Sequence, residues 1–236
     1  MLLHTYFFQI KTTFKSMRKY LLLISALCNT ILISAQVQVR NEPRHHNVFE
    51  NEFARILDVY LAPGDTTLYH LHNTPSVFIV FTNTGVGSQL IGKQSQKGAN
   101  ITGEVSYDNL NIPRIHRVWN EDTSWFHVMD IELTSQKQKK NIAVLQNSAL
   151  KLLFNEQQVI GYNIELKAAS NIQLPSSAFG YLLISKSESN IELKMDDTVQ
   201  DRIMKPSHYI WIEAGNKFAI KNMDNKAANF VLLQFK

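Results

Sequence analysis

Three histidines of this 236-residue chain have the types and spacing of ligands for a transition-metal ion. His70 and His72 are separated by one residue, and alternate residues of a β-strand point to the same face, so both imidazoles would project to one side. They would start about 6.6 Å apart, within reach of one ion bound at about 2.0–2.1 Å from each nitrogen. One strand cannot complete such a site, and His116, in a second strand-like segment, could supply the third nitrogen.

Other polar side chains could assist this site. His127 alternates with apolar residues, so we expect it to face the barrel interior as a fourth ligand, as a group that orients a ligand or moves a proton, or as a core histidine bonded to a backbone carbonyl. Arg55, if it points inward, could hold an anionic substrate. His45 and His46 lie in a polar stretch and are expected on the surface. No residue is identified as catalytic, because the chain has no G-x-S-x-G motif, P-loop or dinucleotide-binding fingerprint.

The segments that carry these residues alternate with a period of two, as β-strands do. Apolar alternation or short apolar runs occur at 55–61, 77–81, 125–133, 210–212, 218–220 and 230–235, with turn signals such as Pro63-Gly64-Asp65 between them. Many short strands between such turns are typical of a sandwich or barrel. A polar, lysine-rich stretch at 134–141 divides the chain. We therefore predict an all-β protein with one domain over 36–138 and a second over 139–236.

The spacing of the histidines resembles the two signature motifs of the cupin superfamily. Gly64, His70 and His72 match the first motif, and His116 and Asn120 match the second. In cupins three histidines, usually with one glutamate, hold a divalent metal inside a small jelly-roll β-barrel. The resemblance implies that role for the three histidines of this chain.

The chain departs from the cupin pattern in two places. Ser76 or Val77 stands where the glutamate is expected, and Asn111 and Pro113 stand where a proline and a glycine are expected. The second departure concerns only a turn. Cupins with three histidines and no glutamate include thiol dioxygenases, so the resemblance still implies a divalent transition metal: Fe, Zn, Ni, Cu or Mn.

The second half of the chain repeats the first without its histidines. An overlay of the two halves gives four correspondences: Pro175 for His70, Ser177 for His72, Phe218 for His116 and Asn222 for Asn120. Proline and phenylalanine cannot bind a metal, and one serine would be a poor ligand. We therefore predict two tandem cupin-like barrels, a metal-binding one followed by a degenerate one that is retained for packing.

The first 35 residues have the composition of a leader. They contain no Asp or Glu, and a basic start at Met17 precedes an apolar run that ends in small residues at Ala35. This order is typical of a secretory signal peptide. An uncut membrane anchor is the alternative, although the run is shorter than the ~20 residues that a spanning helix needs. We expect cleavage after Ala35 and an exported bacterial protein, periplasmic or secreted, with Met17 as its start.

Removal of this leader changes the charge of the chain. The full chain has 24 Lys+Arg and 20 Asp+Glu, and four of its basic residues lie in the leader, which leaves 20 of each sign. Equal numbers of basic and acidic residues give no indication of nucleic-acid binding, which is typically marked by an excess of basic residues. The lone cysteine, Cys28, leaves with the leader, and no later segment is long and apolar enough to span a membrane.

Two classes of function fit these features. In the first, the N-terminal barrel is a metalloenzyme, dioxygenase- or isomerase-like, whose ion is balanced by a small anionic substrate. In the second, a non-catalytic or structural protein binds a small molecule and keeps a vestigial metal site. In either class of function the protein could form a homo-oligomer.

Overall fold

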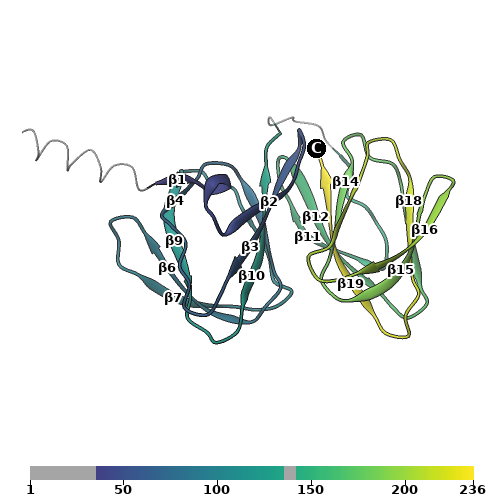
Figure 1. The fold of residues 1–236 in the computed structure, drawn as a ribbon. Coiled ribbons are helices and arrows are strands. Elements are labelled where there is room, and N and C mark those ends of the chain that lie inside the picture. The colour runs from purple at the N-terminus through teal and green to yellow at the C-terminus, as the bar shows by residue number, and fades with distance from the viewer. Residues whose placement is uncertain (1–35, 136–141) are drawn as a thin grey trace, which may run out of the picture.

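The computed structural model describes residues 36–135 and 142–236, and within them the chain is built from β-strands and one short 3-10 helix, η2 (Val39–Asn41). The strands form four sheets, two in each half of the chain (Figure 1). The leader expected over 1–35 and the boundary expected at 138 and 139 lie outside the described residues. In the described part, no helix is long and apolar enough to cross a membrane.

Two five-stranded sheets form the first barrel. One sheet has the order β1 (Val37–Gln38), β4 (His70–His72), β9 (Arg114–Asn120), β6 (Thr84–Leu90) and β7 (Gln96–Asn100). The other has the order β2 (His45–Glu50), β3 (Ala54–Leu61), β10 (Phe126–Leu133), β5 (Ser76–Val80) and β8 (Val105–Asp108). Neighbouring strands are antiparallel except for β1, which pairs with β4 in parallel.

A five-stranded and a four-stranded sheet form the second barrel. The first of them has the order β11 (Leu150–Asn155), β12 (Val159–Leu166), β19 (Ala228–Phe235), β14 (Tyr181–Ser185) and β17 (Tyr209–Ile212). The second has the order β13 (Asn171–Leu174), β18 (Phe218–Asn222), β15 (Ser189–Met195) and β16 (Thr198–Met204). Strand for strand, this order repeats that of the first barrel, and only β1 has no counterpart. The predicted all-β fold with tandem jelly-roll barrels is confirmed.

Two asparagines close the same turn in the two barrels. Asn120 donates a side-chain N–H to the Ser124 carbonyl at 2.7 Å, and Asn222 donates to the Lys226 carbonyl at 2.7 Å. Each side-chain oxygen also accepts the amide N–H two residues later, at 2.9 and 3.0 Å. Asn120 therefore holds the scaffold, as its retention in the second half suggests.

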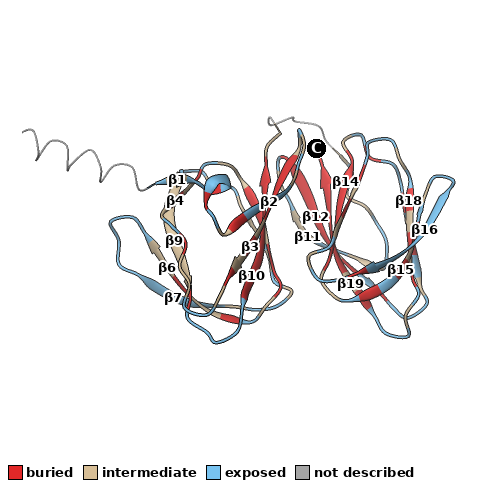
Figure 2. Ribbon diagram, in the orientation of Figure 1, coloured by how far each residue is buried: buried red, intermediate tan, exposed pale blue. Residues whose placement is uncertain are grey.

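The barrels pack against each other through the outer faces of two sheets, the one that contains β3, β10 and β5 and the one that contains β12, β19 and β14. Apolar side chains of both halves form one shared core there, including Ile56, Ile79, Met129, Ile131, Leu133, Val159, Leu182, Val231, Leu233 and Phe235. Every residue of β10 is buried as a result, and the buried strands gather where the barrels meet (Figure 2). Gln158 adds polar contacts by donating to the carbonyls of Leu133 (3.2 Å) and Ser135 (2.6 Å).

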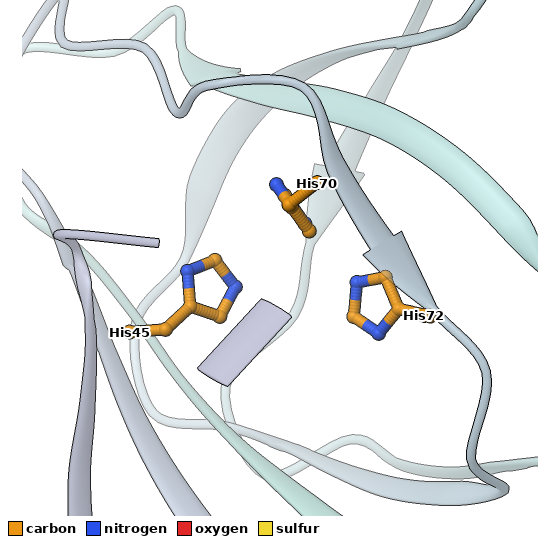
Figure 3. A group of neighbouring side chains, drawn as sticks. All are labelled: His45, His70 and His72. Carbon is orange, nitrogen blue, oxygen red and sulfur yellow. The ribbon is translucent and has the colours of Figure 1, made fainter. Parts of the chain in front are cut away.

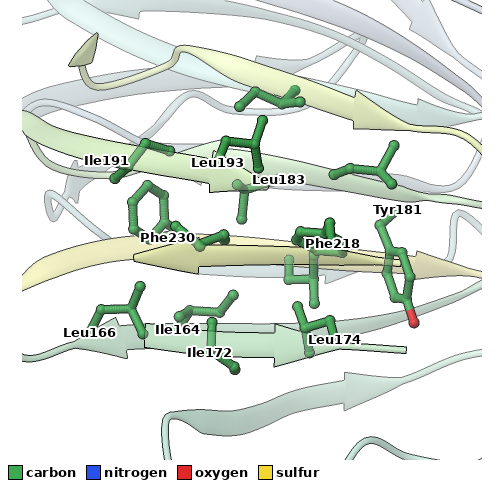
Figure 4. Close-up of a cluster of buried hydrophobic side chains, with 14 of the residues drawn as sticks. Ile164, Leu166, Ile172, Leu174, Tyr181, Leu183, Ile191, Leu193, Phe218 and Phe230 are labelled. Atoms are coloured by element: carbon green, nitrogen blue, oxygen red, sulfur yellow. The ribbon is translucent and has the colours of Figure 1, made fainter. Parts of the chain in front are cut away.

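The interior of the second barrel is filled with apolar side chains. Among them are Leu166, Leu174, Tyr181, Leu183, Phe218 and Phe230, nearly all of them fully buried (Figure 4). Burial of one such side chain contributes roughly 1.5–3 kcal/mol, so this interior is a source of stability.

Candidate metal centre

The three histidines expected as ligands lie on two adjacent strands. His70 and His72 project from the same face of β4, and antiparallel pairing places His116 of β9 opposite His70. The ring centroids of His70 and His116 are 4.7 Å apart, and that of His72 lies 4.9 Å from both. The Nε2 atoms of His72 and His116 are 3.0 Å apart. The structure thus brings the three rings together inside the first barrel.

A fourth histidine, His45 at the start of β2, joins them. The expectation that His45 lies on the surface is wrong, because only 8% of it is exposed and its ring centroid is 4.7 Å from that of His70. One ring nitrogen of each of His45, His70 and His72 lies within 4.8 Å of the others, around a common space (Figure 3). His46 is exposed, as expected. We call His45, His70, His72 and His116 the histidine cluster.

Contacts behind the rings of His70 and His45 direct the other nitrogen of each ring into the shared space. His70 Nδ1 donates to a backbone carbonyl two residues earlier at 2.9 Å, so its Nε2 carries the lone pair and is buried without a hydrogen-bond partner. His45 Nδ1 lies 2.8 Å from Glu42 Oε2, whereas His72 Nδ1, 3.6 Å from Asp130 Oδ2, is too far for a hydrogen bond and is buried without a partner. Carbonyls and carboxylates orient metal-binding histidines in this way.

Glu42 is a buried carboxylate fixed behind His45. Its oxygens accept the backbone N–H groups of Arg44 at 2.7 Å and Leu68 at 3.1 Å. Burial alone raises the pKa of Glu42, but the hydrogen bonds from His45 and these amides outweigh it and hold the pKa below its usual value. An ionised Glu42 keeps the proton of His45 on Nδ1 and makes the inward Nε2 a better electron donor.

Three rings of the cluster, those of His70, His72 and His116, are uncharged at neutral pH. Burial, aided by the charges of neighbouring residues, lowers the pKa of His70 to about 4 and that of His116 to about 3, and lowers that of His72 further. Neutral imidazole is the form that binds metals. Two nitrogens bound at about 2.1 Å to one ion and at about 90° to each other would be about 3.0 Å apart. The buried lone pair and the neutral rings therefore fit a divalent transition metal.

The cluster lines part of a cavity of about 360 Å³. The rest of its wall comprises Val59, Phe78, Val80, Val86, Ala99, Asn100, Glu104, Ser106, Val118, Phe126, Val128 and Asp130. Burial, together with the charge of Glu132, raises the pKa of Asp130 to about 8. A mostly apolar cavity with a few converging polar groups is the usual form of a small-molecule site.

His127 and Arg55 lie away from this cavity. The expectation that His127 faces the barrel interior is wrong, because its neighbours Phe126 and Val128 line the cavity whereas His127 points outward, stacked on Tyr60 at 4.0 Å. Its Nε2 lies 2.8 Å from the carboxylate of Asp58.

Arg55 is occupied by two carboxylates and is not among the residues that line the cavity. Its guanidinium donates to Glu132 at 2.6 Å and to Glu50 at 2.7 Å. The role expected for Arg55, contact with an anionic substrate, stays a prediction that this placement does not favour.

Solved structures resemble the whole described fold at low sequence identity. HEPD from Streptomyces albus, with 2-hydroxyethylphosphonate and Fe(II) bound, is 7% identical with a TM-score of 0.58, over 80% of this chain and 70% of that one. A salicylate 1,2-dioxygenase from Pseudaminobacter salicylatoxidans is 9% identical with a TM-score of 0.55, over 78% and 71%. A cupin 2 conserved barrel domain protein from Leptotrichia buccalis is 9% identical with a TM-score of 0.54, over 81% and 88%.

No protein-family model and no curated protein sequence matches the chain. At identities below 10%, the structural likeness establishes the fold alone. Coverage of about four fifths of the chain extends over both barrels. Together with the strand order and the inward histidines, these matches show that the chain has the cupin fold.

Proposed function

We propose that the first barrel binds one divalent transition-metal ion through His45, His70, His72 and His116, next to a cavity that admits a small molecule. The observation that carries the proposal is the buried Nε2 of His70, which has no hydrogen-bond partner and lies beside three other imidazoles. Leaving such an atom without a partner is unfavourable unless something binds it.

Imidazole ligands suit Fe, Zn, Ni and Cu, and Mn is a further candidate. The Fe(II) in the HEPD structure supports iron among these. The histidine cluster would hold the ion, which would supply Lewis acidity and coordination positions open to a ligand from the cavity. His45, fixed by Glu42, takes the place of the glutamate that the cupin pattern leads one to expect.

The proposed role is that of a metal-dependent enzyme of the dioxygenase or isomerase kind, supported by the dioxygenase among the structural neighbours. A binding barrel without turnover is the competing role. Export to the periplasm or the medium is a separate proposal that depends on the composition of residues 1–35 alone.

Metal analysis of residues 36–236, purified without a tag, tests the metal site. We expect about one equivalent of transition metal per chain, because the described residues contain one such cluster. His70→Ala should lose the metal. His127→Ala is the matched control and should keep it, since His127 lies outside the cavity. Two tightly bound equivalents, or unchanged metal content in His70→Ala, would contradict the assignment. Dioxygen uptake by the iron-loaded protein with candidate substrates then separates an enzyme from a binding barrel.

A further inference from the structure

The cavity next to the histidine cluster has a wall whose chemistry restricts what it can hold. Eight of its side chains are apolar, and the polar ones beyond the cluster are Asn100, Glu104, Ser106 and Asp130. No Lys or Arg is among the residues that line it. An anion placed among these side chains would lose its hydration and gain no cationic partner from the protein.

Two arginines of the first barrel, Arg55 and Arg114, are bound by carboxylates through their terminal nitrogens, while the Nε atom of each has no hydrogen-bond partner. Arg55 donates to Glu132 and Glu50, at 2.6 and 2.7 Å, and Arg114 donates to Asp108 at 2.5 Å. Releasing either arginine to a ligand would leave a carboxylate uncompensated.

Beyond the histidine cluster, two residues of the wall have buried polar atoms without a hydrogen-bond partner. Both carboxyl oxygens of Asp130 and the side-chain nitrogen of Asn100 are buried without a hydrogen-bond partner. Asp130 is 1% exposed, and its Oδ2 lies 3.6 Å from the Nδ1 of His72, beside the histidine cluster. A ligand that satisfies Asp130 therefore carries a hydrogen-bonding group there, and a hydroxyl both donates and accepts.

We propose that the cavity takes a small, largely apolar alcohol or phenol, with its hydroxyl beside Asp130 and the histidine cluster and its hydrocarbon body among the valines and phenylalanines of the wall. The placement of the hydroxyl near a metal rests on the proposed function, whereas the apolar, uncharged character of the ligand rests on the wall alone. The volume of about 360 Å³ is roughly twice that of the ~150 Å³ cavity that holds benzene, so a two-ring molecule fits.

Three probes of one shape test the proposal: 2-naphthol, 2-naphthoate and naphthalene. Each is titrated into metal-free and metal-loaded protein (residues 36–236) at pH 7, and binding is followed by calorimetry or probe fluorescence. In the metal-free protein we expect 2-naphthol to bind at least about tenfold more tightly than either of the others, a factor that one buried hydrogen bond to a polar group can give. Equal or tighter binding of 2-naphthoate to the metal-free protein would overturn the proposal.

Two variants locate the probe. Asp130→Leu removes the hydroxyl partner and should reduce 2-naphthol binding to the level of naphthalene, while naphthalene binding stays unchanged. Val128→Phe places a large ring in the cavity and should abolish binding of all three probes with the circular dichroism unaltered. Unchanged 2-naphthol affinity in either folded variant would also overturn the proposal.

Metal content measured on the same samples separates this inference from the proposed function. Protein that binds 2-naphthol selectively but takes up no metal supports the inference and contradicts the proposed function. Protein that binds one equivalent of metal but prefers 2-naphthoate when metal-free supports the proposed function and contradicts the inference.

Discussion

The two barrels share a strand order but differ in what their interiors hold. In the first, four histidines and a cavity of about 360 Å³ occupy the centre, whereas apolar side chains fill the second. Strand pairing gives three correspondences: Leu150 for His45, Leu174 for His70 and Phe218 for His116. Asn147, whose backbone carbonyl accepts from the residue three later, likewise stands where Glu42 does.

This difference shows that the barrel does not need its histidines in order to fold. Asn120 and Asn222 make the same turn contacts in both halves, so the scaffold has been kept while the interior diverged. Buried imidazoles whose nitrogens lack partners are unfavourable for stability, and the second barrel has apolar side chains at three of the four positions. The histidine cluster is therefore best understood as a functional feature that the first barrel carries at a cost in stability.

Deletion of the second barrel should have the largest effect. Residues 36–140 alone would expose the outer face of β10, where Met129, Ile131 and Leu133 now pack on the other half. An exposed apolar sheet face of this kind promotes association. We expect an insoluble or self-associating fragment by size-exclusion chromatography. A soluble monomer with native-like melting and full metal affinity would show instead that the barrels are independent.

A cut chain is the control for this deletion. A protease site inserted within 136–141 of the full-length protein should allow cleavage without separation, because the shared core and the contacts of Gln158 would still hold the halves together. Separation of the two fragments under native conditions would contradict a stabilising interface.

Much of this comparison could be predicted from sequence, since period-two patterns and motif spacing are local features. Alternation predicted the strands, and the motif spacing predicted that His70, His72 and His116 would meet. The ligand role of these residues stays a prediction. The overlay was wrong by one residue at β13, where pairing with β18 places Leu174, not Pro175, at the position of His70. A sequence overlay does not detect such a one-residue shift, because a difference in the length of the connecting loops compensates for it.

Two features of the site depended on tertiary contacts that no local pattern encodes. β2 is an edge strand whose residues after His45 are mostly exposed, so nothing in the pattern marks one histidine as inward. β10 is buried on both faces, and its more apolar face packs on the second barrel while Asp130 faces the cavity. The usual inference that the apolar face is the inner one therefore placed His127 on the wrong side.

Replacement of a histidine by its counterpart should remove metal binding and keep the fold. His116→Phe introduces the residue that occupies the same position in the second barrel, Phe218. We expect metal affinity to fall by about 100-fold or more, because one ligand is lost and the ring blocks the shared space. Metal titration monitors the affinity, and melting of the metal-free protein should show a stability equal to or above that of the parent. Unchanged affinity would remove His116 from the site.

The pH dependence of stability should originate in the first barrel. The lowered pKa values of His70, His72 and His116 mean that the unfolded chain binds more protons between about pH 6.5 and 4, so metal-free protein loses stability as the pH falls through that window. Asp130, with its raised pKa of about 8, favours the folded state at low pH and offsets one of these protons. The net loss is on the order of 1–3 kcal/mol per pH unit.

Urea denaturation of metal-free protein at several pH values checks this slope. His70→Leu, which introduces the counterpart Leu174, should flatten the slope by removing one of the three protons. His208 is exposed in the second barrel and provides the matched control, since His208→Leu should leave the slope as it is. A slope of the opposite sign over pH 4–6.5 would mean that the cluster is not buried in solution.

The smallest expected effect compares one phenylalanine in each barrel. Phe230 lies in the filled interior and is fully buried, so Phe230→Ala should cost about 3–5 kcal/mol, the sum of lost transfer energy and a new cavity. Phe126 borders a cavity that already exists, so Phe126→Ala removes fewer packing contacts and should cost only about 1.5–3 kcal/mol, the transfer contribution alone. Denaturation of both metal-free variants at pH 7 measures the difference, expected at roughly 2 kcal/mol. Equal losses would mean that side chains close the first cavity in solution when no ligand is present. In that case the two interiors would differ in chemistry but not in packing, and ligand binding in the first barrel would have to begin with an opening of its wall.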